Sequence, residues 1–177
     1  LESGEKIKAD LYVSALPYSR LYNVVPPALL TQNIGFEESP IVSINLFFDR
    51  SVFQEDFFGS LNGPCEWFFN KGPVKTKMGE LHHVMGIISA GKDWLGLPKS
   101  EILSQVVEQL KTLKPQAAQA DLQHGLVNIE RGATHSCTPD FERVRPQQKV
   151  CENFYVIGDW TQTGLPGTIE SAVASAS

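Results

Sequence analysis

The stretch FYVIGDWTQTGLPGTIESAVASA, residues 154–176, carries the pattern on which the fold depends. Its first four residues are apolar and partly β-branched, which is typical of a short strand. Gly158 and Asp159 end that run, and a loop rich in Thr and Gly follows. Thr168–Ala174 then has the composition expected at the start of a helix. The sequence therefore predicts a strand, a Gly-Asp turn and a helix N-terminus in its last segment.

This order of elements is suited to holding a cofactor. In open α/β sheets, ligands bind beyond the carboxyl ends of the strands. A helix N-terminus offers unpaired N–H groups and a partial positive charge, while an Asp carboxylate accepts hydrogen bonds from sugar-like hydroxyls. Small residues such as Gly164 and Gly167 let the backbone approach a flat ring closely. The same residues also fit an ordinary turn and helix entry, and at this point both interpretations stay open.

Composition excludes several classes of protein. The chain has 177 residues, 42% of them hydrophobic and 20% charged, which is ordinary for a soluble globular protein. A net charge of −5 argues against a surface for nucleic acid. No apolar run approaches the roughly 20 residues of a transmembrane helix. The three cysteines, Cys65, Cys137 and Cys151, fit no zinc pattern and no disulfide framework, so we expect no metal and a reducing, cytoplasmic setting.

The rest of the chain divides into two zones. Leu11–Leu16 is nearly all apolar and suits a strand that is buried on both faces of a parallel sheet. In the middle zone Ser100 is expected to cap a helix whose apolar residues recur at helical spacing as far as Leu113. The strands expected in that zone are Ile41–Asp49, Cys65–Asn70, His82–Ala90 and Val127–Thr134. We therefore expect α/β ends around an inserted, mostly antiparallel α+β domain.

Read as a whole, residues 154–176 resemble the C-terminal flavin motif of the flavin-containing amine oxidoreductase and carotenoid desaturase superfamily. The version GDWTQTGLPGTIESA is most similar to squalene-associated, FAD-dependent desaturases, with plant-type phytoene desaturases close to them. Three further segments are similar to other parts of that family: ADLYVSALPYSRLYNVVP (9–26), SPIVSINLFFDRSV (39–52) and ATHSCTPDFERVRP (133–146). The resemblance thus covers nearly the whole chain.

Two residues depart from the motif, and one element of the family is absent. Ile157 stands where Ala is commoner, and Ser171 adds bulk where the family usually has Gly. Members carry a G-x-G-x-x-G turn near their N-terminus, where it holds the ADP pyrophosphate, and this chain has none. Because the chain also starts without Met and ends within an apparent helix, we expect the C-terminal part of a longer flavoprotein, without its N-terminal dinucleotide-binding half. The expected domains are part of a Rossmann-like FAD-binding domain (1–38), a substrate-binding domain (39–135) and the C-terminal segment of the FAD-binding domain (136–177).

The resemblance implies FAD as the cofactor and assigns its contacts. Asp159 is expected at the ribityl or pyrophosphate region, and Gly158 allows close approach there. The backbone N–H groups expected at the N1/O2 edge of the isoalloxazine belong to Gly167, Thr168 and Ile169. The residues expected near the other side of the flavin are Ala15, Leu16 and Pro17.

Aromatic residues gather in the middle zone, where they suit either a core or an apolar tunnel for a long isoprenoid. The residues chosen as substrate contacts are Phe47, Trp67 and Phe69. Since a flavin performs the hydride chemistry, few polar catalytic groups are needed, and the sequence identifies no catalytic residue. For the remaining polar residues we expect no functional role. The histidines expected to be packed or solvated are His82, His83, His124 and His135, and Arg143 and Arg145 are expected in a solvated loop.

We therefore expect the parent protein to be an FAD-dependent oxidoreductase that acts on a squalene-, phytoene- or carotenoid-type isoprenoid, with this part alone inactive. Access to such a substrate implies peripheral association with a membrane, and exposed sheet edges imply a homodimer of this part. One alternative is a relative of amine or protoporphyrinogen oxidases with a polar or tetrapyrrole substrate. Another is a non-catalytic module that binds isoprenoids or proteins.

Overall fold

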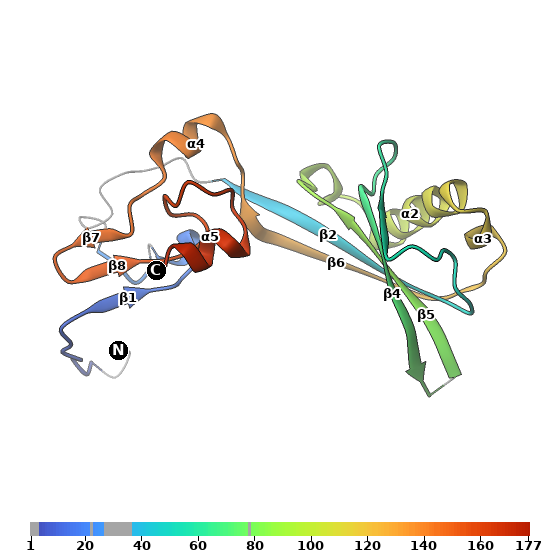
Figure 1. The fold of residues 1–177 in the computed structure, drawn as a ribbon, viewed down its shortest axis with the longest axis horizontal. Helices are drawn as coiled ribbons and strands as arrows, with labels where there is room; N and C mark the ends of the chain where they lie inside the picture. The colour runs from blue at the N-terminus through green and yellow to red at the C-terminus, as the bar shows by residue number, and fades with distance from the viewer. Residues whose placement is uncertain (1–3, 22, 27–36, 78) are drawn as a thin grey trace. The chain divides into compact units, whose positions relative to one another are not determined.

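The computed structural model describes residues 4–21, 23–26, 37–77 and 79–177, and these form two compact units. One unit is Glu38–Thr134, and the other combines Leu1–Glu37 with His135–Ser177. Each unit is built on its own sheet (Figure 1). The assignment of these units to substrate binding and flavin binding stays a prediction.

The middle unit contains a five-stranded sheet in the order β3-β4-β5-β2-β6. Its strands are β2 (Glu38–Phe48), β3 (Phe57–Gly59), β4 (Trp67–Thr76), β5 (Gly79–Ile88) and β6 (Leu122–His135). The pairs β2–β5, β4–β5 and β3–β4 are antiparallel, as the sequence predicts. Because side chains alternate along a strand, every second residue of β2 faces the core, and these are Val42, Ile44, Leu46 and Phe48. The four predicted strands at 41–49, 65–70, 82–90 and 127–134 thus correspond to β2, β4, β5 and β6.

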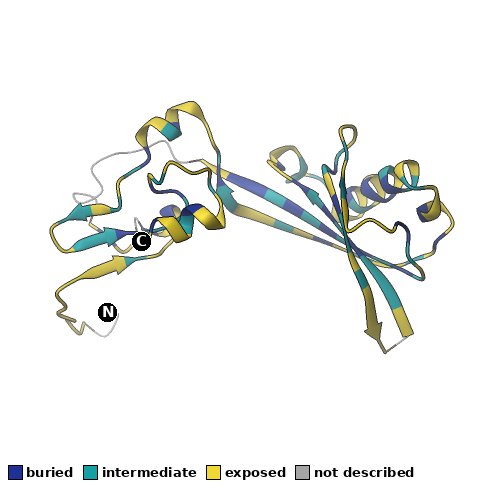
Figure 2. Ribbon diagram, viewed as in Figure 1, coloured by how far each residue is buried: buried dark blue, intermediate teal, exposed yellow. Residues whose placement is uncertain are grey.

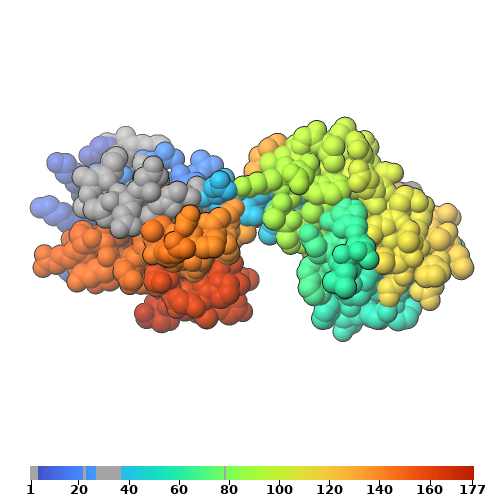
Figure 3. Space-filling view, turned by 90° about the horizontal axis from the view of Figure 1, so that it is seen from above, coloured from blue at the N-terminus to red at the C-terminus, as the bar shows by residue number. Residues whose placement is uncertain are grey.

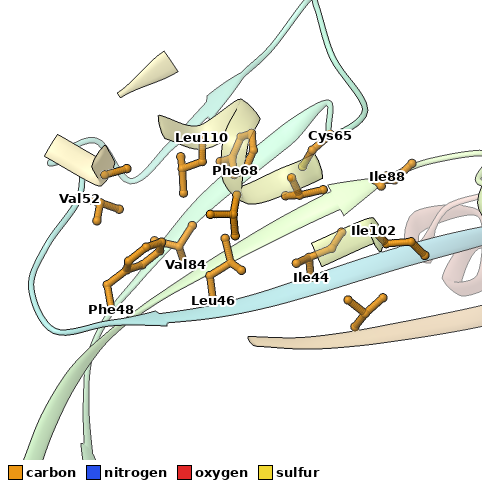
Figure 4. Close-up of a cluster of buried hydrophobic side chains, with 14 of the residues drawn as sticks. Ile44, Leu46, Phe48, Val52, Cys65, Phe68, Val84, Ile88, Ile102 and Leu110 are labelled. Carbon is orange, nitrogen blue, oxygen red and sulfur yellow. The ribbon is translucent and has the colours of Figure 1, made fainter. Parts of the chain in front are cut away.

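Helices cover one face of this sheet. They are the 3-10 turn η2 (Lys92–Trp94), α2 (Lys99–Leu113) and α3 (Pro115–Ala118). Ile102, Val106 and Leu110 follow one another at intervals of about one helical turn and are fully buried in the same cluster as the sheet residues. Figure 4 shows Ile102 and Leu110 among these sheet residues. The prediction of Ser100 as the N-cap is wrong, because Pro98 precedes the first turn with φ −58 and ψ 138 and places Ser100 inside it.

The other unit contains a three-stranded sheet in the order β1-β8-β7. Its strands are β1 (Tyr12–Ser14), β7 (Lys149–Cys151) and β8 (Phe154–Val156), and its helices are α1 (Tyr18–Leu21), α4 (Pro139–Val144) and α5 (Ile169–Ala174). β1 and β8 run parallel, with Tyr12 opposite Phe154. A mixed α/β fold with an inserted antiparallel sheet is therefore confirmed, while the Rossmann-like detail stays a prediction.

A small hydrophobic core joins the N-terminal and the C-terminal segments of this unit, which the middle unit separates in the sequence. Tyr18, Leu21, Phe141, Val156 and Trp160 are its large buried side chains. The Trp160 indole N–H donates to the carbonyl of Leu16 at 3.3 Å, and its ring meets Tyr18 edge to face, with centroids 5.3 Å apart. The residues that follow β1 are thereby fixed beside the residues that follow β8.

The prediction that β1 is buried on both faces is wrong for this chain. Leu11 and Val13 are 53% and 54% exposed, and Figure 2 shows β1 coloured as exposed. The physical reason is that, among the described residues, β8 is the only element with more than a few contacts to β1, so no layer of helices or strands covers the two faces of β1. A hollow of about 580 Å³ lies against this sheet, lined by Leu11, Val13, Tyr155, Ile157 and residues 174–177 among others. No helix in the described part of the chain is long and apolar enough to cross a membrane.

Candidate functional site

The turn after β8 requires glycine at position 158. Gly158 has φ +153, a conformation that L side chains rarely adopt. A Cβ atom there would also lie 2.6 Å from Nε1 of Trp160, which is buried. The Gly158 N–H donates to the Ser175 hydroxyl at 2.9 Å, so the turn is tied to the end of α5. These contacts therefore fix the backbone conformation of the turn, and they place the next residue, Asp159, just beyond the end of β8.

The start of α5 presents free backbone donors on an apolar surface. Thr168 is the N-cap, and its hydroxyl accepts from the N–H of Ser171 at 3.4 Å. No acceptor within the described residues takes the N–H groups of Gly167, Thr168, Ile169 and Glu170. The side chain of Ile169 is 81% exposed, and Leu165 is exposed too. Free N–H groups next to exposed apolar side chains fit a flat ring with a polar edge, so these residues fit a flavin.

A buried arginine fastens the loop between the turn and the helix. The Arg145 side chain is only 1% exposed. Its Nη1 donates to the carbonyl of Leu165 at 2.7 Å and to the Glu142 carboxylate at 3.0 Å. Its Nη2 donates to the carbonyl of Asp159 at 2.5 Å and to the hydroxyl of Ser171 at 3.2 Å. One guanidinium thus links α4, both ends of the loop and α5. In Figure 3 the orange segment that contains α4 lies against the red segment that contains the loop and α5.

The prediction of a solvated loop is wrong at Arg145. At Arg143 the predicted exposure to solvent is right, but the residue lies in the helix α4 and not in a loop. Arg143 is exposed and pairs with Asp140 at 3.2 Å. Arg145 follows the last residue of α4, and its side chain is buried. Thr138 caps this helix by accepting from the N–H of Phe141 at 3.2 Å, and Pro139 occupies the first turn. The Thr-Pro pair is a recognisable helix start, and it was the signal that could have found this helix.

Ser171, which adds bulk where the family usually has Gly, is fully buried in the same network. Its hydroxyl lies 2.7 Å from the hydroxyl of Thr163 and donates to the carbonyl of Asp159 at 3.2 Å. It also accepts from Arg145. The hydroxyl group that Ser171 has and glycine lacks is therefore directed into the loop, where its hydrogen bonds stabilise the loop.

His135 lies beneath the start of α5, between two carboxylates. Its Nδ1 is 3.9 Å from Asp159 and its Nε2 is 3.8 Å from Glu142, and its ring packs on Phe141. A Cβ on Gly167 would lie 2.4 Å from this imidazole, so the helix entry rests on it. Burial lowers the pKa of His135, and the charge of Asp159 opposes that shift. The sequence shows no acidic partner near His135, and the fold supplies two.

Donor atoms of His135, Cys137 and Glu142 lie within 4.8 Å of one another. Glu142 already accepts from the Arg145 guanidinium, which is charged at every accessible pH. That fixed positive charge opposes a cation at this position, and the absence of a metal site stays a prediction.

The remaining predicted flavin contacts lie in the same unit. Residues 15–17 follow β1 and are exposed. The carbonyl of Leu16 accepts from Trp160, and the N–H of Ile157 donates to the carbonyl of Ser14 at 2.9 Å. The fold thus brings Ala15, Leu16 and Pro17 beside the Gly158–Trp160 turn.

The predicted substrate contacts lie in the other unit, on the face of the sheet opposite α2. Their sequence neighbours Phe48 and Phe68 are fully buried on the helix side, so alternation directs Phe47, Trp67 and Phe69 the other way. Phe57 joins them, with its ring centroid 6.0 Å from Phe69 and 6.1 Å from Trp67. We call this set the aromatic face: Phe47, Phe57, Trp67 and Phe69.

A model of the family described as flavin containing amine oxidoreductase matches residues 1–177. The chain belongs to this family. Among its relatives, it is 25% identical to a 15-cis-phytoene desaturase of Synechococcus elongatus over 98% of this chain and 40% of the relative. It is 29% identical to a hydroxysqualene dehydroxylase of Sinorhizobium fredii over 94% of this chain and 36% of the relative. The chain therefore spans about two fifths of the length of these relatives.

Solved structures show the same fold at low identity. A putative protoporphyrinogen oxidase from Exiguobacterium aligns with a TM-score of 0.61 and 12% identity, over 95% of this chain and 39% of that one. Cyclohexylamine oxidase from Brevibacterium oxydans aligns with a TM-score of 0.53 and 13% identity, over 98% of this chain and 44% of that one. Membership of the flavin-containing amine oxidoreductase family confirms the resemblance and the predicted cofactor, FAD. The individual contacts to FAD stay predictions.

Proposed function

We propose that the whole protein is an FAD-dependent oxidoreductase that transfers a hydride between its flavin and a squalene-, phytoene- or carotenoid-type isoprenoid. The observation that carries the proposal is the pairing of two features in one chain. One is the turn and helix start that fit a flavin, and the other is the aromatic face. The names of two relatives, a phytoene desaturase and a hydroxysqualene dehydroxylase, support an isoprenoid as the substrate.

The flavin side of the proposal assigns a role to each residue of the turn. The Asp159 carboxylate accepts hydrogen bonds from hydroxyls of the cofactor, and Gly158 lets the cofactor approach the backbone. The N–H groups of Gly167, Thr168 and Ile169 donate to the N1/O2 edge, where they stabilise negative charge. Ala15, Leu16 and Pro17 border the other side. When bound, FAD supplies the centre that accepts or donates the hydride.

The substrate side rests on the chemistry of the aromatic face. Trp67 and Phe69 pair with Ile87 and Met85 on β5, and these pair in turn with Ser43 and Asn45 on β2. These rows contain no charged side chain, so a cationic amine would find no carboxylate partner there. Aromatic rings bury large apolar areas against a hydrocarbon chain. The rows therefore favour an isoprenoid over the amine alternative, with Phe47, Trp67 and Phe69 as its contacts.

Two further proposals concern assembly and location. The exposed apolar strand β1 supports dimerisation of the 177-residue chain when it is prepared by itself. Sedimentation of this chain at high concentration tests that idea, and a clean monomer would refute it. An isoprenoid substrate also supports peripheral association of the whole protein with a membrane, which flotation with lipid vesicles tests.

The experiment that tests the function is anaerobic mixing of the full-length holoprotein with squalene, phytoene and cyclohexylamine. The flavin absorbance is followed in two series, one that starts from the oxidised flavin and one that starts from the reduced flavin. We expect an isoprenoid to change the redox state of the flavin and the amine to leave it unchanged. Reduction by the amine alone would refute the proposal in favour of an amine oxidase.

A further inference from the structure

A buried histidine lies next to the residues that we assign to FAD. His135 is the last residue of β6, and its side chain is only 1% exposed. A Cβ built on Gly167 would lie 2.4 Å from Cε1 of this imidazole, so the entry to α5 packs against the ring. Nδ1 of the same ring lies 3.9 Å from the Asp159 carboxylate. His135 is therefore adjacent to both segments that are proposed to hold the cofactor.

The charged groups that face His135 come from the segments packed around it. Asp159 faces Nδ1 from the turn after β8, and Glu142 of α4 lies 3.8 Å from Nε2. The Arg145 guanidinium bonds to Glu142 at 3.0 Å. The thiol of Cys137 is the other titratable group that the described residues place close to the ring. Two carboxylates thus accompany one guanidinium, and a proton on His135 would neutralise the negative charge that remains.

In the protein without cofactor, burial disfavours this proton. Burial lowers the pKa of His135, the charges of Asp159 and Glu142 oppose that shift, and the charge of Arg145 adds to it. The imidazole is therefore mostly neutral at pH 7. The Asp159 side chain is 35% exposed, so water weakens its attraction for a proton on the ring. The charge of His135 thus depends on what covers Asp159.

FAD bound at Asp159 would favour the protonated ring in two ways. The pyrophosphate adds negative charge near the cluster, and the cofactor displaces the water that screens Asp159. We propose that His135 takes up a proton when FAD binds, so that this positioning residue makes the affinity for FAD rise as the pH falls. By linkage, the protonated protein binds FAD more tightly by the same factor by which FAD favours the proton. The inference rests on the proposed function, because it needs the cofactor beside Asp159.

The test is calorimetric titration of the full-length protein, freed of its flavin, with FAD. Titrations in buffers of different ionisation enthalpy give the protons taken up for each FAD that binds. We expect uptake of up to about one proton, and binding about tenfold tighter at about pH 6 than at about pH 7.5. His135→Gln cannot titrate, so the uptake should vanish. Glu142→Gln removes one facing carboxylate and keeps an acceptor for Arg145, so the uptake should move to lower pH.

His124→Gln is the matched control, because His124 is exposed and belongs to the middle unit, and it should leave the uptake unchanged. FAD binding without proton uptake in the unaltered protein would overturn the inference, as would uptake that survives His135→Gln. A purely structural His135 gives the opposite trend, since a buried neutral imidazole loses stability as the pH falls, so weaker FAD binding at the lower pH would also overturn it. In these cases FAD still binds and the proposed function stands. If the protein binds no FAD at either pH, the proposed function fails together with the inference.

Discussion

The Arg145 guanidinium donates a 2.5 Å hydrogen bond to the backbone carbonyl of Asp159, the residue proposed to contact the flavin ribityl or pyrophosphate. The contact is buried and joins the loop to α4 through Glu142. The carboxylate of Asp159 is left for other partners, since the arginine uses only its carbonyl. Arg145 is therefore a positioning residue for the candidate site.

Replacement of this arginine should loosen the loop. In Arg145→Met the carbonyls of Asp159 and Leu165 lose their donor, and Glu142 loses its ion pair. We expect a loss of about 1.5–3 kcal/mol in the free energy of unfolding, the range for hydrogen bonds to a charged group. FAD affinity of the full-length protein should fall at least tenfold. The matched control is Arg143→Met, which removes an exposed arginine and should change stability by no more than about 0.5 kcal/mol.

Gly167→Ala should strain the start of α5. The new Cβ would lie 2.4 Å from Cε1 of the buried His135. Overpacking of this kind costs about 1–3 kcal/mol, which thermal unfolding of the purified variant measures. Gly96→Ala is the control, because a Cβ at Gly96 would meet nothing within 4 Å. If the clash is the cause, adding His135→Ala to Gly167→Ala should recover part of the loss.

Stability should depend on pH through His135. Its pKa is lowered by burial from an ordinary value of 6.5, so the unfolded chain takes up a proton before the folded one does. The stabilising contribution is therefore complete above about pH 6.5 and is lost as pH falls below it. His135→Gln should reduce the slope of unfolding free energy between pH 7 and pH 5, as measured by urea titrations. His124→Gln, at an exposed histidine, should keep the slope, and an unchanged slope in His135→Gln would contradict the account.

Trp67→Ala should weaken isoprenoid binding without affecting the flavin. Trp67 is part of the aromatic face and is not in the core cluster, so its removal should change stability little. We expect the affinity for squalene to fall about tenfold, as for a large aromatic contact. Leu61→Ala removes a fully exposed apolar side chain elsewhere and should have no effect. Equal losses in both variants would argue for a non-specific change in solubility.

Local patterns predicted much of the fold and part of the candidate site. The strand, turn and helix of residues 154–174 were predictable, because Gly158, the Pro-Gly entry and the small residues of α5 act within a few positions. In the structure, alternation along β2 places Phe47 on the opposite face from the buried Phe48. Very short strands such as β7 were missed, because three residues are too few to show a period.

Tertiary relationships could not be read from the sequence. No acidic residue lies within four positions of His135 along the chain, yet Asp159 and Glu142 lie on either side of it in the structure. The hydrogen bond between His83 and Asn45 likewise joins two strands that are far apart in the sequence. The burial expected for Leu11–Leu16 was wrong because apolar composition indicates what a strand would bury but does not supply the layer that covers it.

The central claim is that the Gly158–Asp159 turn and the start of α5 hold FAD. Its most direct test is the FAD content of the full-length protein and its Gly158→Val variant, from absorbance of flavin released by heat. A Cβ at position 158 collides with Trp160, so the account predicts about one FAD per chain in the unaltered protein and a large loss in the variant, with the middle unit still folded. Full-length protein that lacks FAD, or a folded variant that retains it, would contradict the account.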